Sequence, residues 1–144
     1  MPLVHATAVQ VEGTGVLLRG PSGSGKSDLA LRLIDAGAIL VADDQCALER
    51  APAGIEVRAP APLAGKLEVR GLGIITLPAA TSAILGLVVD LVAPPAVSRL
   101  PDPQTAEILG VSLPCVRLAA FEASAAAKLR LAVVSCRVFI IPAP

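Results

Sequence analysis

The segment from Gly20 to Ser27 constrains this chain more than any other, because it matches the pattern G-x-x-x-x-G-K-[ST] in full. Glycines let such a loop fold into a nest of inward-pointing N–H groups, and a helix that follows adds partial positive charge at its start. The predicted phosphate loop consists of Gly20, Pro21, Ser22, Gly23, Ser24, Gly25, Lys26 and Ser27. Its lysine offers a charge to terminal phosphates and its last serine offers a hydroxyl to Mg²⁺. The loop therefore predicts a site for a nucleoside triphosphate or another polyphosphate.

The flanking residues predict the elements that such a loop needs. Residues 16–18 are apolar and indicate a short buried strand before the loop, and 28–36 favour a helix after it, with Gly37 as its cap. Residues 3–11 alternate well enough for an earlier strand, and 38–42 indicate a second buried strand. Strand, loop and helix thus stand in the right order.

The remaining chain continues the alternation of strands and helical segments. It predicts a polar hairpin over 46–58, a half-strand with a glycine-rich turn over 66–75, a strand over 84–92, a short helix over 104–110, a strand over 113–118 and a helix over 123–134. This alternation favours the α/β class, with a P-loop nucleotide-binding core. No repeat or second domain is visible, so we expect one domain over residues 1–144.

Composition excludes several classes of protein. Hydrophobic residues make up 54% of the chain, which argues against disorder. Twelve basic residues balance twelve acidic ones, and Trp and Tyr are absent, so neither a polycationic surface nor a base-stacking platform for nucleic acid is expected. Three cysteines without a CxxC pair, and a single histidine, argue against zinc.

The expected compartment is the cytoplasm, and no membrane association is expected. The odd number of cysteines suggests free thiols in a reducing environment. The N-terminus lacks the basic start and apolar run of a signal peptide. Residues 71–89 carry no charge and are long enough to span a bilayer, but glycines and a proline interrupt them, so two buried strands are the better interpretation.

Two apolar strands end in aspartate, and each could deliver an acid beside the loop. Asp90 has the more ordinary pattern of a metal-binding acid in nucleotide hydrolases. Asp43 and Asp44 are adjacent, so their side chains point in different directions and cannot share one role. One of these two is a candidate base next to a metal-bound phosphate, and a solvated turn is the alternative.

A second candidate pair lies on one face of a predicted strand. Glu68 and Arg70 are two residues apart, so in an extended segment they share a face. The carboxylate could hold Mg²⁺ and the guanidinium could bind a phosphate of the nucleotide. An exposed ion pair of little energetic value is the alternative interpretation.

Three strings together resemble a known family. The phosphate loop, then 40–44 (Leu-Val-Ala-Asp-Asp), then 68–75 (Glu-Val-Arg-Gly-Leu-Gly-Ile-Ile) are similar to the C-terminal catalytic domain of HPr kinase/phosphorylase. The last string is the most specific, because many families share the loop. The resemblance covers about residues 3–76 firmly and 77–118 more weakly. The short form is similar to those of alphaproteobacteria, in which the family's separate N-terminal domain is absent.

This resemblance implies a protein serine kinase. Members of the family use ATP with Mg²⁺, and sometimes pyrophosphate, to phosphorylate a serine of HPr, a carrier of the sugar phosphotransferase system. Many also run the reverse phosphorylase reaction, and the family is typically hexameric. Its fold is similar to the nucleotide-binding core of phosphoenolpyruvate carboxykinase. Here 118–127 lack the Gly-Arg-Asn string that the family uses for dephosphorylation, which favours the kinase direction alone.

The resemblance also implies roles for particular residues. His5 corresponds to a histidine near the phosphates, and Asp44 to the acceptor of the serine proton. Arg99 resembles the arginine of a family string whose glycine is replaced here by Pro101. The implied catalytic set is His5, Lys26, Asp43, Asp44 and Arg99, and the implied metal ligands are Ser27 and Glu68.

Two rival interpretations remain. One is a different P-loop kinase or nucleotide hydrolase that uses Asp90 for its metal. The other is a regulatory module that binds ATP and a partner without transferring phosphate.

Overall fold

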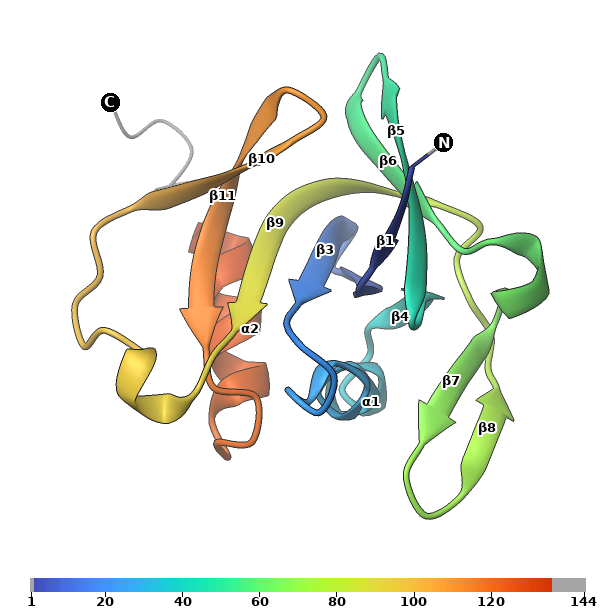
Figure 1. Ribbon diagram of the computed structural model, residues 1–144, viewed down its shortest axis with the longest axis horizontal. Helices are drawn as coiled ribbons and strands as arrows, with labels where there is room; N and C mark the ends of the chain where they lie inside the picture. Colours follow the sequence, from blue (N-terminus) through green and yellow to red (C-terminus); the bar gives the residue numbers. More distant parts are fainter. Residues whose placement is uncertain (1, 136–144) are drawn as a thin grey trace.

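The computed structural model describes residues 2–135, which form an α/β structure with a mixed sheet (Figure 1). The elements in chain order are β1 (Leu3–His5), β2 (Thr7–Val11), β3 (Thr14–Arg19), α1 (Lys26–Asp35), β4 (Ile39–Ala42), β5 (Gln45–Ala51), β6 (Gly54–Arg58), η1 (Ala61–Leu63), β7 (Lys66–Val69), β8 (Gly73–Thr76), β9 (Ala83–Leu91), η2 (Pro94–Ala96), β10 (Gln104–Ile108), β11 (Val111–Leu118) and α2 (Ala125–Ser135). The elements η1 and η2 are single turns of 3₁₀ helix.

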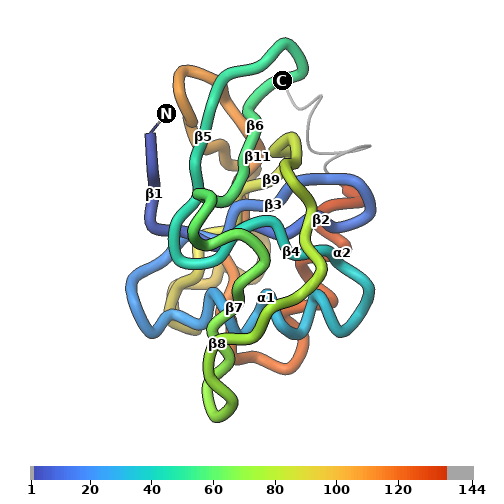
Figure 2. The backbone as a smooth tube through the Cα atoms, turned by 90° about the vertical axis from the view of Figure 1, so that its right-hand side faces the viewer, coloured from blue at the N-terminus to red at the C-terminus, as the bar shows by residue number. Residues whose placement is uncertain are grey.

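The long strand β9 is the centre of the sheet. It pairs in parallel with β3 on one side and with β11 on the other, and its first residues pair antiparallel with β6. The strands run in the order β1-β5-β6-β9-β3-β2-β4, and β10 joins through β11. Leu87, Val88 and Val89 are all buried, as expected for a strand covered on both faces. The hairpin of β7 and β8 forms a separate sheet that projects from the body (Figure 2).

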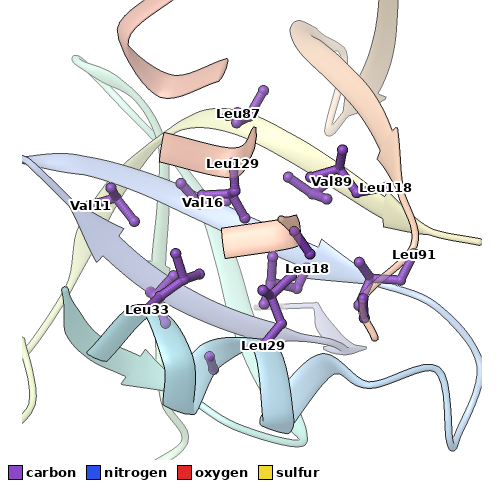
Figure 3. Packing of buried hydrophobic residues seen from close by; sticks show 14 of the residues in the cluster. Val11, Val16, Leu18, Leu29, Leu33, Leu87, Val89, Leu91, Leu118 and Leu129 are labelled. Carbon is purple, nitrogen blue, oxygen red and sulfur yellow. The ribbon is translucent and has the colours of Figure 1, made fainter. Parts of the chain in front are cut away.

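Two apolar clusters cover the two faces of the sheet. On one face, Leu29 and Leu33 of α1 and Leu129 of α2 pack against Leu18 and Val89 (Figure 3). The other face carries a second cluster from β4, β5, β6, β10 and the opposite side of β3 and β9. Both helices therefore lie on the same side, and their burial depends on the sheet.

Four strands direct their carboxyl ends to the same edge of the sheet. Strands β3, β9 and β11 are mutually parallel. Strand β4 is antiparallel to β2, which is antiparallel to β3, so β4 runs in the direction of β3. Ligands of open α/β sheets bind outside the carboxyl ends of the strands. The segments that follow β3, β4 and β11 therefore meet where a ligand is expected.

Most predicted elements are present, with two corrections. The strand predicted over 3–11 is divided at Ala6: β1 pairs with β5, whereas β2 pairs with β3. The helix predicted over 104–110 is wrong. This segment is β10, in which Ala106 and Ile108 are buried and Glu107 between them is exposed, the period of a strand with one buried face.

The uncharged stretch 71–89 forms β8 and most of β9, in agreement with the prediction of two strands. None of the helices in the described part of the chain has the length and apolar character that crossing a bilayer requires.

We expect Leu129→Ala to lower the free energy of unfolding by about 2–5 kcal/mol, because it leaves a cavity between α2 and the sheet. The matched control is Leu131→Ala on the same helix, whose side chain is 68% exposed. This control should stay within about 0.5 kcal/mol of the wild type. Urea unfolding followed by circular dichroism measures both, and equal losses in the two variants would contradict the packing of α2.

Candidate active site

The predicted phosphate loop lies between β3 and α1, and its polar groups turn inward. Gly23 and Gly25 have φ of 84° and 98°, which glycine adopts without strain. The Nζ of Lys26, a residue only 7% exposed, donates to the carbonyl oxygens of Gly20 and Pro21 at 2.7 and 3.1 Å. The hydroxyl of Ser24 is buried and has no hydrogen-bond partner among residues 2–135. An ammonium held only by loop carbonyls and an unsatisfied hydroxyl fit a site that receives phosphate oxygens.

Gly25 also lets the loop touch the segment after β11. A Cβ atom at this position would lie 2.7 Å from the Cβ of Ala120 and 3.0 Å from the Cζ of Phe121. Any side chain at position 25 would therefore push the loop and this segment apart.

Asp43 joins the loop to the neighbouring strands. Its Oδ1 accepts hydrogen bonds from the hydroxyls of Ser27 at 2.7 Å and Thr7 at 2.8 Å, and its Oδ2 accepts from the backbone N–H of Glu68 at 3.1 Å. The residue is 5% exposed. Because Ser27 donates its proton to Asp43, the lone pairs of its oxygen stay available for a metal ion.

Asp44 points away from Asp43, as the sequence predicts. Its side chain is 65% exposed, and its Oδ1 lies 3.2 Å from the Nε2 of His5. The φ of Asp44 is 70°, and the N–H of Gln45 donates to the carbonyl of Asp43 at 2.8 Å. A three-residue turn with positive φ at its centre is rare and strained. Strain of this kind is typical of functional positions and directs the Asp44 carboxylate to solvent beside His5.

The donors near the loop fit Mg²⁺ held jointly with phosphate. Among residues 2–135, no three His, Cys, Asp or Glu side chains are placed to hold a metal by themselves. Mg²⁺ usually keeps several waters and uses one or two carboxylates together with substrate phosphates. Ser27 and the exposed Glu68, whose backbone lies against Asp43, supply donors of that kind.

Asp90 is engaged elsewhere. Arg19 donates from Nε to its Oδ1 at 2.8 Å and from Nη2 to its Oδ2 at 3.1 Å, and the thiol of Cys115 lies 3.5 Å from Oδ2. Burial alone would raise the pKa of Asp90, but the hydrogen bond and charge of Arg19 outweigh it, and the pKa is lowered. The hydrogen bond with Asp90 raises the pKa of Arg19. Since both carboxylate oxygens serve this ion pair, the geometry favours Asp43 over Asp90 beside Ser27.

The two described cysteines are free and buried. Burial, followed by the charge of Asp43, raises the pKa of Cys46 to about 12, and burial with the charge of Asp90 raises the pKa of Cys115 to about 11. Both thiols therefore stay protonated at neutral pH. Cys136 lies outside the described residues.

Arg70 and Arg99, two arginines that the sequence predicts at the site, take no part in these hydrogen bonds and ion pairs. Arg70 lies in the exposed turn between β7 and β8, and Arg99 lies in the exposed segment between η2 and β10. Neither guanidinium forms a side-chain hydrogen bond or ion pair within the described range 2–135. In Figure 1 these two segments lie on opposite sides of the molecule.

Sequence reasoning missed three side chains that shape the site. Thr7 bonds Asp43, and the only signal for it is a polar residue between Ala6 and Ala8 in a buried strand. Arg32 holds the segment after β11, and Phe121 touches the loop. No local pattern marks these last two contacts, because they join positions about ninety residues apart.

The fold and the loop together define a class of protein. A G-x-x-x-x-G-K-[ST] loop follows the central strand β3, and its serine is bonded to the acid that follows β4, a strand separated from β3 by β2. This is the arrangement of a P-loop phosphate-binding protein. More narrowly, the chain belongs to the HPr serine kinase C-terminal domain family, whose sequence profile matches residues 2–136.

Individual proteins agree with this family. The chain is 52% identical over 75 residues to the HPr kinase/phosphorylase of Bordetella pertussis, covering 51% of this chain and 24% of that protein. It is 40% identical over 121 residues to the HPr kinase/phosphorylase of Burkholderia lata, covering 76% and 38%. The chain thus spans less than two fifths of the length of these curated relatives.

A solved structure shows the same architecture. The Hpr(Ser) kinase/phosphatase from Coxiella burnetii superposes with a TM-score of 0.85 at 26% identity, over 96% of this chain and 97% of that chain. The P-loop α/β core expected from the sequence is confirmed. The likeness to phosphoenolpyruvate carboxykinase stays a prediction.

The ion pair of Arg19 and Asp90 predicts a pH-dependent stability. Because the folded-state pKa of Asp90 is lowered, the pair stabilises the fold fully above the unfolded-state pKa of about 3.9. This contribution is lost as the pH falls through the lower folded-state value. Asp90→Asn should cost about 1 kcal/mol at pH 7, since the pair is partly exposed to solvent.

Urea unfolding of wild type and Asp90→Asn at pH 7 and at successively lower pH measures this difference, which should shrink in acid. Asp102→Asn, at an exposed acid of the loop before β10, is the control and should show no such trend. A difference that stays constant as the pH falls would contradict the assigned pair.

Proposed function

We propose that this chain is a Mg²⁺-dependent protein serine kinase that transfers the γ-phosphate of ATP to a serine of the phosphocarrier protein HPr and thereby regulates the phosphotransferase system. The hydrogen bond from Ser27 to Asp43 carries the proposal. This bond holds Ser27, at the metal-binding end of the phosphate loop, against Asp43 at the end of β4. The next residue is Asp44, whose carboxylate is exposed. The names of the relatives support HPr as the acceptor.

The loop binds and orients the donor. Backbone N–H groups of the loop bind the phosphates, and Lys26 exchanges the carbonyls of Gly20 and Pro21 for terminal phosphate oxygens. This exchange needs no large movement, because the ammonium already lies inside the loop. The hydroxyl of Ser24 gains a phosphate partner in the same step.

Ser27 and Glu68 hold the metal ion, with Asp43 as the residue that positions both. When bound there, Mg²⁺ would supply positive charge that neutralises the phosphates. Asp43 keeps the proton of Ser27 directed away from the metal side, and its bond to the Glu68 backbone fixes the start of the β7–β8 hairpin.

Asp44 accepts the proton of the acceptor serine. Its carboxylate is exposed, so a side chain of another protein can reach it, and His5 holds it from one side. A base within hydrogen-bond reach of the attacking hydroxyl contributes about 10²–10⁴-fold to the rate. Arg70 and Arg99 are exposed, and we propose that they bind phosphate or HPr only when ATP and HPr are both bound.

We propose that the chain catalyses phosphate transfer mainly in the kinase direction and contacts other proteins through its β7–β8 hairpin. Residues 118–127 have no Gly-Arg-Asn string, which favours the kinase direction over the phosphorylase direction. Leu72 and Ile74 of the β7–β8 hairpin are 75% and 71% exposed, which suits contact with a further copy of the chain or with the acceptor. We place the activity in the cytoplasm, without nucleic acid or membrane as partners.

Transfer of γ-³²P from ATP with Mg²⁺ to purified HPr tests the activity. We expect label on a serine, and we expect Asp44→Asn to lower the rate by about 10²–10⁴-fold while ATP still binds. Asparagine tolerates positive φ, so the strained turn is kept. Asp90→Asn is the matched control and should retain most of the rate. The reverse ranking would favour the rival P-loop enzyme with Asp90 at its metal, and ATP binding without any transfer would favour the regulatory module.

Metal dependence tests the assigned ligands. Removal of Mg²⁺ with EDTA should abolish transfer, and Glu68→Gln should raise the Mg²⁺ concentration for half-maximal rate by about tenfold or more. Glu107→Gln, at an exposed position of β10, is the control and should leave the Mg²⁺ dependence unchanged. An unchanged Mg²⁺ requirement in Glu68→Gln would remove this residue from the ligand set.

A further inference from the structure

We propose that Phe121 is a stacking platform for the base of the bound nucleotide, on the turn that links β11 to α2. The inference deepens the proposed function, since it rests on a nucleotide bound at the phosphate loop. It names a binding residue that no motif of the chain marks.

The first observation is direct contact between this turn and the phosphate loop. The Cζ of Phe121 would lie 3.0 Å, and its Cε1 3.2 Å, from a Cβ placed on Gly25. Gly25 immediately precedes Lys26 and α1. The ring therefore lies at the rim of the loop, within reach of a ligand whose phosphates occupy it.

The second observation is that the turn is tied down on both sides of Phe121. Arg32 of α1 donates to the carbonyl of Ala120 from Nη2 and to that of Glu122 from Nη1, the latter at 3.3 Å. Asp28, one turn earlier on α1, holds the same guanidinium at 3.1 Å from Nε. Lys128 of α2 pairs with the Glu122 carboxylate at 3.0 Å. The backbone at Phe121 is thus held in place before any ligand arrives.

The third observation is the exposure of the ring. Phe121 is 69% exposed, although its neighbour Ala120 is buried. It is the sole Phe, Tyr or Trp in residues 2–135. A fixed backbone that presents an aromatic ring to solvent beside a polyphosphate site matches the way proteins stack nucleic-acid bases, which is tolerant of base identity.

The order of the strands gives the ligand a direction. Going along the sheet edge, the segment after β4 with its two acids lies on one side of the phosphate loop, and the segment after β11 lies on the other. Terminal phosphate at the acids and base at Phe121 would place a nucleotide across the loop. A ligand in the opposite direction would bring its base, instead of its reacting phosphate, to Asp44.

The absence of Trp from the chain allows a clean optical test. In Phe121→Trp the indole becomes the single tryptophan of the protein. We expect its fluorescence to change on addition of ATP or ADP with Mg²⁺, and to stay constant with inorganic tripolyphosphate, which has no base. Leu131→Trp, at an exposed position of α2, is the control and should respond to neither.

Calorimetry with the Phe121→Ala protein separates base binding from phosphate binding. Its affinity for ATP should fall by about tenfold or more, while its affinity for tripolyphosphate stays within about twofold of the wild type. Phe121→Tyr keeps the ring and should bind ATP as the wild type does.

Each other outcome overturns the inference. Equal losses of ATP and tripolyphosphate affinity in Phe121→Ala would give the ring a structural role only, and would leave the proposed kinase intact. Indole fluorescence that does not change in a Phe121→Trp protein that binds ATP by calorimetry would place the base elsewhere. If the wild type binds neither ATP nor tripolyphosphate, the phosphate site itself is overturned.

Discussion

The arrangement of the site depends on the hydrogen bonds that the buried carboxylate of Asp43 accepts. A buried charge is stable only where hydrogen bonds satisfy it, and here the donors come from β2, α1 and β7. Removing any one donor would leave part of the carboxylate unsatisfied. The same bonds therefore hold three separate segments together and place the hydroxyl of Ser27 and the backbone of Glu68 at one point beside the phosphate loop.

The environment of each aspartate decides what it can do. Asp43 is buried and fully bonded, so it positions other groups. Asp44 follows on a strained turn and is exposed beside His5, so it can meet a group from another molecule. Asp90 ends an apolar strand just as Asp43 does, yet Arg19 occupies both of its oxygens. Three aspartates at one sheet edge thus have three different environments, and their hydrogen-bond partners rather than their positions in the sequence distinguish them.

Local patterns in the sequence predict the parts of the site that are contiguous. The phosphate loop, its flanking strand and helix, and the opposite directions of Asp43 and Asp44 follow from spacing alone. The bond of Thr7 to Asp43, the pairing of Arg19 with Asp90 and the clamp of Arg32 do not, because strand order decides which distant residues meet. The error over 104–110 has a related cause: this segment has weak local preference, and pairing with β11 makes it a strand.

A crystal structure with Mg²⁺ and a non-hydrolysable ATP analogue would show which acids face the bound nucleotide. We expect the Mg²⁺ ion beside Ser27 and Glu68, the terminal phosphate facing Asp44, and Lys26 released from the carbonyls of Gly20 and Pro21. The pair of Arg19 and Asp90 should be unchanged. A metal ion coordinated by Asp90, with Asp44 remote from the terminal phosphate, would contradict the assignment of Asp43 and Asp44, which follow β4, as the acids of this site.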